Sequence, residues 1–185
     1  FRTREIMCVV REVTEYGGTC VVMSYWNPIL QYGPERFAKD LAAAGGRGTI
    51  IPDLIPEEAG QWQRAAEANG LSNIMLVAPS STNERLQLTA TASTGFVYAT
   101  SHMGVTGAQA SVDSAAGKLV ARTREVTDTP VCVGLGVSNG EQAAEIAEFA
   151  DGVIVGSALI KAAMKSTDDL VTLARELAAG VRGES

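Results

Sequence analysis

The strongest constraint on the fold of this chain is a unit that repeats along it. A short apolar run rich in β-branched residues is followed by a polar or Gly/Pro turn, and then by an amphipathic stretch rich in Ala, Leu and Glu. The runs lie at 20–25, 48–54, 73–79, 95–100, 130–136 and 152–158. They are continuous rather than alternating, which is typical of strands buried on both faces. Strict alternation of strands and helices predicts a parallel sheet with right-handed crossovers.

The stretches between the runs carry helix signals. Pro34 suits the first turn of one helix, and Gly70 suits the end of the helix predicted over 57–70. Ser138 and Asn139 are candidate N-caps of another helix, because their side-chain oxygens can accept bonds from free backbone N–H groups. The segment before the first run also has a helical pattern, so the order is a helix followed by strand–helix repeats.

Two architectures fit this order: an open doubly wound sheet, or a (β/α)8 barrel, whose usual size is roughly 250 residues. We favour the barrel, with strands three to eight present and the first two strands missing, as one partial barrel domain over residues 1–185. The chain starts at Phe1 without an initiator methionine. This suggests a fragment, a processed chain or an expressed piece with residues missing upstream.

Composition excludes several classes of function. The formal net charge is −6 and no Lys/Arg cluster stands out, which argues against a nucleic-acid surface. No apolar run approaches the roughly 20 residues that a membrane span needs, and no signal peptide is recognisable. The three cysteines are scattered, and the single His102 cannot complete a tetrahedral zinc set with them. We therefore expect a cytoplasmic protein without a metal site.

Glycine-bearing turns end the last three predicted strands. Gly134 and Gly136 follow the fifth run, Gly156 and Ser157 follow the sixth, and the long loop 101–111 follows the fourth. In (β/α)8 barrels the loops after the last two strands commonly bind phosphate through backbone N–H groups. No Lys/Arg clamp lies in these turns, so we expect a phosphate monoester on a small metabolite rather than a nucleotide.

At this point the sequence resembles a known family. The stretches "SYWNPILQYGPERFAKDLAAAG", "PDLIPEE", "LVAPSST", "GFVYATSHMGVTGA" and "PVCVGLGVSNGEQAAEIAEFADGVIVGSALI" are similar to the tryptophan synthase α subunit over nearly the whole chain. The family is a (β/α)8 barrel that cleaves indole-3-glycerol phosphate to indole and glyceraldehyde 3-phosphate. This retro-aldol cleavage needs a proton delivered to indole C3 and protons removed from the indole N–H and a glycerol hydroxyl.

The resemblance implies a substrate site at the carboxyl ends of the strands. The substrate phosphate would lie against Gly107, Gly134, Gly136, Gly156 and Ser157. Thr106 would belong to a closing lid, and Tyr98 would face the substrate. The apolar slot for the indole ring would be lined by Met23, Ile50 and Leu135.

The resemblance also implies a partner. Asn27, Asp53 and Pro56 would face a β subunit that carries pyridoxal phosphate, so no cofactor is expected in this chain. Asp53 has a second interpretation of equal weight, in which its side chain simply orders its own loop. His102 is expected to be an ordinary loop residue.

The departure from the family pattern concerns the acid/base pair. The family's catalytic Glu and Asp correspond to positions upstream of Phe1, and among the 21 acidic residues only Asp53 follows the end of a predicted strand. One carboxylate is not a pair, so no catalytic residue is assigned. Two alternatives stay open: a fragment that binds phosphate or the β subunit without turnover, and another phosphate-binding barrel enzyme.

Overall fold

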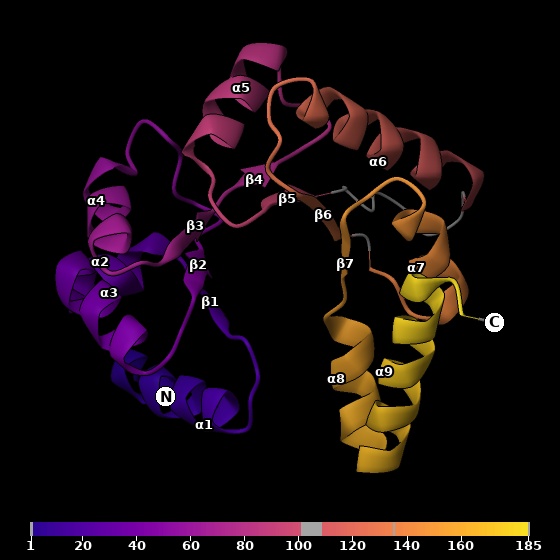
Figure 1. The fold of residues 1–185 in the computed structure, drawn as a ribbon, viewed down its shortest axis with the longest axis horizontal. Helices are drawn as coiled ribbons and strands as arrows, with labels where there is room; N and C mark the ends of the chain where they lie inside the picture. Colours follow the sequence, from indigo (N-terminus) through magenta and orange to yellow (C-terminus); the bar gives the residue numbers. More distant parts are fainter. Residues whose placement is uncertain (1, 101–108, 135, 185) are drawn as a thin grey trace. The chain divides into compact units, whose positions relative to one another are not determined.

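A computed structural model describes residues 2–100, 109–134 and 136–184, and its ribbon is drawn in Figure 1. By their contacts the residues divide into two compact units. The first comprises Phe1–Leu76 and Leu88–Gly95, and the second comprises Val77–Gln87 and Phe96–Ser185. Each of the six predicted runs contains strand, so the order of elements inferred from the sequence is confirmed.

The first unit holds a short parallel sheet in the order β1-β2-β3. Its elements are the 3-10 helix Thr3–Glu5, α1 (Ile6–Glu15), β1 (Val21–Met23), α2 (Trp26–Tyr32), α3 (Pro34–Ala43), β2 (Gly48–Ile50), α4 (Gly60–Ala68) and β3 (Ser72–Ile74). Helices α2, α3 and α4 lie along one side of the strands (Figure 1). The helix predicted over 57–70 begins later, at Gly60, and the chain turns at Gly70 with a φ of +64°.

The core of the first unit is aromatic and aliphatic. Phe37, Leu41 and Trp62 are fully buried, and the rings of Phe37 and Trp62 meet edge to face with centroids 6.0 Å apart. Phe37 and Leu41 lie four residues apart on α3, so one face of that helix covers the sheet. Pro34 occupies the first turn of α3, as predicted.

The run 73–79, predicted as one strand, is divided. The structure has β3 (Ser72–Ile74) and β4 (Leu76–Val77), which belong to different sheets. At the junction, the buried backbone N–H of Met75 donates to the side-chain oxygen of Ser93 at 3.1 Å. A side chain replaces a neighbouring strand as the acceptor at this point, so the ladder of strand hydrogen bonds is interrupted.

The second unit is built on a sheet in the order β4-β5-β6-β7. Its further elements are β5 (Val97–Thr100), α6 (Gln109–Arg124), β6 (Val131–Gly134), α7 (Gly140–Ala147), β7 (Gly152–Ile154), α8 (Ser157–Lys165) and α9 (Thr167–Arg182). Helix α5 (Asn83–Ala92) has residues in both units. Strands β5, β6 and β7 pair in parallel. The loop expected over 101–111 is shorter at its end, because α6 already begins at Gln109.

Helices α7, α8 and α9 pack together beside β7 (Figure 1). The backbones of α7 and α9 approach closely at Gly180. A Cβ at this position would collide with the carbonyl group of Gly140, so the contact depends on glycine. The backbone N–H of Gly140 donates to the Glu176 carboxylate at 2.8 Å, and the predicted cap Asn139 accepts from Gln142 N–H at 2.9 Å. Within the described part of the chain, no helix is both long and apolar enough to cross a membrane.

Candidate functional site

The carboxyl ends of β6 and β7 and the start of α8 form the corner predicted to bind phosphate. Gly134 and Ile154 are partners in the parallel register, so the two strands end together. Gly156 is the N-cap residue of α8, and no side chain caps this helix. Gly156 and Ser157 are both exposed. The first N–H groups of α8 therefore face outward with the partial positive charge of a helix N-terminus.

Glycine is required at Gly134 and Gly136 for two different reasons. A Cβ at Gly134 would lie 2.9 Å from Cε1 of Tyr98 and closer still to its hydroxyl oxygen. Gly136 has a φ of +69°, in the left-handed region that other residues rarely adopt. The backbone at Gly134 can consequently approach the neighbouring ring, and Gly136 adopts a conformation that a side chain would strain.

Tyr98 lies on β5 and is half-buried, with its ring against Gly134. Burial raises the pKa of the Tyr98 phenol above its ordinary value. The hydroxyl is therefore neutral at physiological pH and can donate a hydrogen bond at the edge of the β6 corner. Tyr98, Gly134, Gly136, Gly156 and Ser157 all belong to the second unit.

Some predicted site residues lie outside the described residues. These are the lid residues Thr106 and Gly107, together with Leu135 and His102. Their assignments stay predictions. Among the residues that are described, no group of three or more His, Cys, Asp or Glu side chains could hold a metal ion.

Met23 and Ile50, predicted to line an apolar slot, are register partners on β1 and β2. Ile50 is 7% exposed, whereas Met23 at the end of its strand is 59% exposed. The backbone N–H of Ser24 donates to the Ile50 carbonyl at 3.1 Å, which continues the pairing beyond the strand. The structure thus places these two side chains next to each other at the carboxyl end of the first sheet.

Asp53 joins the two loops predicted to meet a partner. Its Oδ1 accepts a hydrogen bond of 2.8 Å from the backbone N–H of Trp26, the first residue of α2. Asp53 therefore fixes the loop after β2 to the loop after β1, and its contact with a partner stays a prediction. Asn27 and Asp53 are exposed and Pro56 is partly exposed.

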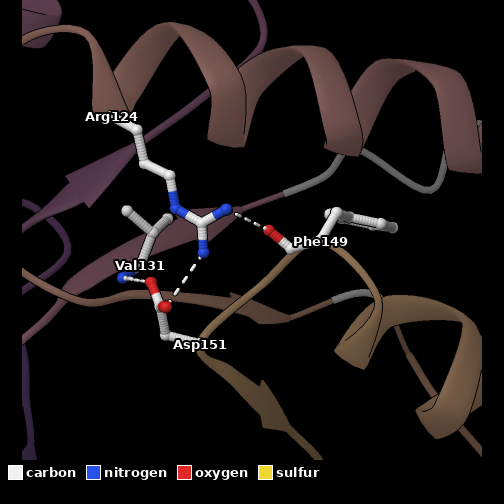
Figure 2. Close-up of polar contacts among 4 residues, drawn as sticks. All are labelled: Arg124, Val131, Phe149 and Asp151. Atoms are coloured by element: carbon white, nitrogen blue, oxygen red, sulfur yellow. Dashed lines mark hydrogen bonds and ion pairs between the residues drawn. The ribbon is translucent and has the colours of Figure 1, made fainter.

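A polar cluster lies at the opposite, amino end of β6 and β7 (Figure 2). The Asp151 carboxylate accepts from Val131 N–H at 2.8 Å and pairs with Arg124 at 2.9 Å, and Arg124 also donates to the Phe149 carbonyl at 2.7 Å. The Val131 N–H, and then the Arg124 guanidinium, hold the pKa of Asp151 below its ordinary value. This cluster ties α6 to two strands, away from the glycine corner.

Sequence reasoning missed one cation that joins α6 to a loop far away in the sequence. Arg122 on α6 bonds to the loop between β4 and α5. An arginine near the end of a helix is usually read as a solvated residue, and its acceptors lie about forty positions earlier in the chain. No local sequence signal connects them.

Comparisons with known proteins agree with the architecture and the order of these features. A family model described as "Tryptophan synthase alpha chain" matches residues 2–184. A curated tryptophan synthase alpha chain from Nocardia farcinica is 60% identical over 181 residues, which cover 98% of this chain and 68% of that protein. One from Mycobacterium ulcerans is 59% identical and covers 98% and 67% respectively.

Solved structures extend the match to the fold. A structure of Mycobacterium tuberculosis tryptophan synthase matches with a TM-score of 0.92 and 56% identity, over 98% of this chain and 70% of that one. The tryptophan synthase A-subunit of Pyrococcus furiosus matches with a TM-score of 0.83 and 30% identity, over 99% of this chain and 74% of that one.

Proposed function

This chain belongs to the tryptophan synthase alpha chain family, and from that premise we propose how its residues serve the family's reaction. Tryptophan synthase alpha chains are lyases that cleave indole-3-glycerol phosphate to indole and glyceraldehyde 3-phosphate. They work with a β subunit, to which the pyridoxal phosphate belongs. The open alternative of a different phosphate-binding barrel is excluded by the family.

The substrate phosphate binds, on this proposal, at the corner formed by the ends of β6 and β7. Support comes from the uncapped start of α8 at Gly156 and Ser157, directly after β7 and beside the glycines Gly134 and Gly136. A phosphate dianion would accept hydrogen bonds from the free N–H groups and gain from the helix dipole. This uncapped helix start is the observation that carries the proposal. Thr106 and Gly107, in the neighbouring loop, are assigned to the lid and to the phosphate only on family resemblance.

The remainder of the substrate is assigned to one aromatic and several apolar residues. Tyr98 adjoins Gly134, so its neutral hydroxyl suits a contact to the glycerol portion. Met23, Ile50 and Leu135 are assigned to the indole ring on family resemblance, and the register pairing of Met23 with Ile50 makes an apolar strip of these two residues. Burying an indole ring against such a strip contributes favourably in proportion to the apolar area removed from water.

The described residues offer no acid/base pair at these strand ends. Asp53 is the only carboxylate among them that lies within three residues of the carboxyl end of a strand. Its Oδ1 already accepts from Trp26 N–H. We therefore assign no catalytic acid or base within these residues, and we assign Asn27, Asp53 and Pro56 to the surface that meets the β subunit.

The strand numbering, the domain extent and the cellular location are also proposals. The six strand positions would be the third to eighth of a (β/α)8 barrel, and residues 1–185 would belong to one such domain. Support comes from the glycine corners on the last two strands and from the match to tryptophan synthase structures along nearly the whole chain. A cytoplasmic location is proposed because the family makes an amino acid from metabolic intermediates.

Indole release from indole-3-glycerol phosphate tests the proposal. We expect the 185-residue chain to bind glycerol 3-phosphate and indole-3-glycerol phosphate by calorimetry but to release no indole. A full-length alpha chain of the same family is the positive control. Indole release by the 185-residue chain would refute the conclusion that the described residues contain no catalytic acid/base pair. Failure to bind either phosphate ester would refute the phosphate corner.

A further inference from the structure

One arginine side chain holds the whole loop between β4 and α5. The Nη2 atom of Arg122 donates to the Ser81 carbonyl at 2.6 Å and to Oδ1 of Asn83 at 2.8 Å. Nε donates to the same Oδ1 at 3.2 Å, and Nη1 lies 3.5 Å from the Pro79 carbonyl. A single guanidinium therefore contacts the loop near its start and at its end.

The acceptors of Arg122 are neutral oxygens, two of them backbone carbonyls. By contrast, Arg36 and Arg124 form ion pairs with carboxylates. Arg122 thus acts through the number and the planar geometry of its donors. A lysine has one nitrogen and cannot reproduce a fork that meets three residues.

The loop held by Arg122 begins at the carboxyl end of the sheet. Val77 ends β4 and Thr100 ends β5, and the Thr100 hydroxyl donates to the Val77 carbonyl at 3.1 Å. The two strands therefore end side by side, and β5 also carries Tyr98. Loops at this end build the active site in (β/α)8 barrels.

The place of β4 in the strand order determines which part of the substrate the following loop can contact. In the order β4-β5-β6-β7, the end of β4 lies two strands from β6 and three from β7. At about 4.8 Å per strand, the loop is roughly 10–14 Å from the phosphate corner. That distance separates it from the phosphate and places it toward the indole end of the substrate.

We propose that Arg122 is a positioning residue, which holds the loop 78–82 in place as a wall for the aromatic portion of the substrate. This inference rests on the phosphate corner proposed above, which fixes the other end of the substrate. Arg122 itself touches no substrate. Its effect should therefore appear in the binding of the aromatic ester and not in the binding of a plain phosphate ester.

The neighbouring Arg124 provides a matched control on the same helix. It also bridges α6 to other elements, but it does so at the amino end of the strands (Figure 2). R122M, R122K and R124M are compared with the wild type, each well below its own unfolding temperature. Calorimetry gives the Kd for indole-3-glycerol phosphate and for glycerol 3-phosphate.

We expect R122M to raise the Kd for indole-3-glycerol phosphate about tenfold, because a wall displaced by about 1 Å no longer fits the ring. R122K should recover only part of this loss. The Kd for glycerol 3-phosphate, and both Kd values of R124M, should stay within about twofold of wild type.

Three outcomes would overturn the role of Arg122: an unchanged Kd for indole-3-glycerol phosphate in R122M, equal losses for both esters, or the same loss in R124M. If the wild type binds neither ester, the phosphate corner fails first and this inference fails with it. The wild-type measurement therefore distinguishes the two failures.

Discussion

At the scale of single residues, Asp151 shows how one carboxylate can connect a helix and two strands. It accepts the Val131 N–H and pairs with Arg124, and its own N–H donates to the Val131 carbonyl at 2.9 Å. Its pKa is lowered relative to the unfolded chain, where an Asp titrates near about 3.9. The carboxylate therefore stabilises the folded state above that pH, and this contribution is lost as pH falls through the folded pKa.

D151N should lower the free energy of unfolding by about 1 kcal/mol at pH 7. The loss is modest, because the Asp151 side chain is 42% exposed and solvent screens the ion pair. The difference from wild type should shrink as the pH falls below about 3.9, the value for an Asp in an unfolded chain, and should vanish only below the lowered pKa of the folded Asp151 carboxyl. Urea unfolding at pH 7, 5 and 3 measures it, with D128N as a control at an exposed acid. An equal loss at pH 7 and pH 3 would contradict the electrostatic explanation.

The role of a residue could be predicted where it depends on residues nearby in the sequence. It could not be predicted where it depends on a distant segment. Asn139 was predicted as a cap from local pattern, and it caps α7. Asp53 was given two interpretations, and the bond from Trp26 N–H supports the ordering one without testing the partner contact. Arg122 was missed, because its acceptors lie on a different element and periodicity carries no information about such pairs.

At the scale of elements, the start of α8 is a place where a substitution should change phosphate binding without lowering stability. Gly156 has a φ of −126°, and a Cβ there would meet nothing within 4 Å. Asn and Asp are both favoured N-caps, so either substitution should keep or raise stability by about 0.5 kcal/mol. Only aspartate adds a negative charge beside the proposed phosphate.

G156D should therefore weaken glycerol 3-phosphate binding more than tenfold, about ten times more than G156N does, because like charges repel in a partly desolvated site. Calorimetry measures the binding, and thermal unfolding confirms that both variants remain folded. Equal losses in G156D and G156N would indicate steric blocking rather than charge repulsion. Unchanged binding in both would remove this helix from the site.

Elements were predictable where pattern and length agreed. The six apolar runs and the Pro34 helix start follow from buried-strand composition and from the fixed φ of proline. The division of the run 73–79 was not predictable, because it depends on a hydrogen bond from Met75 N–H to Ser93, eighteen residues away. Helix α4 began later than predicted, because Glu57 and Glu58 fit a helical pattern but lie in turns.

At the scale of the whole molecule, α8 carries two strongly exposed large apolar side chains. Ile160 and Met164, one helical turn apart, are 62% and 83% exposed. In the described part of the chain, the adjacent β7 is the last strand of its sheet and has one edge without a strand partner. Exposed apolar groups beside a free strand edge favour association between molecules.

We expect the isolated 185-residue chain to self-associate in a concentration-dependent way, and a variant with both I160K and M164K to shift toward the monomer. Sedimentation velocity measures the distribution of species. A variant with Q31K and T91K adds the same charge at exposed polar positions and should leave association unchanged. A monomeric wild type, or equal effects of the two double variants, would contradict the assignment to α8.

The interleaving of the two units along the chain bears on how the protein emerges from the ribosome. The first unit needs Leu88–Gly95, which are synthesised only after Val77–Gln87 of the second unit. Domains formed from one continuous segment can fold as soon as they leave the exit tunnel. We therefore expect the amino-terminal unit to stay incomplete during synthesis until part of the second unit has been translated.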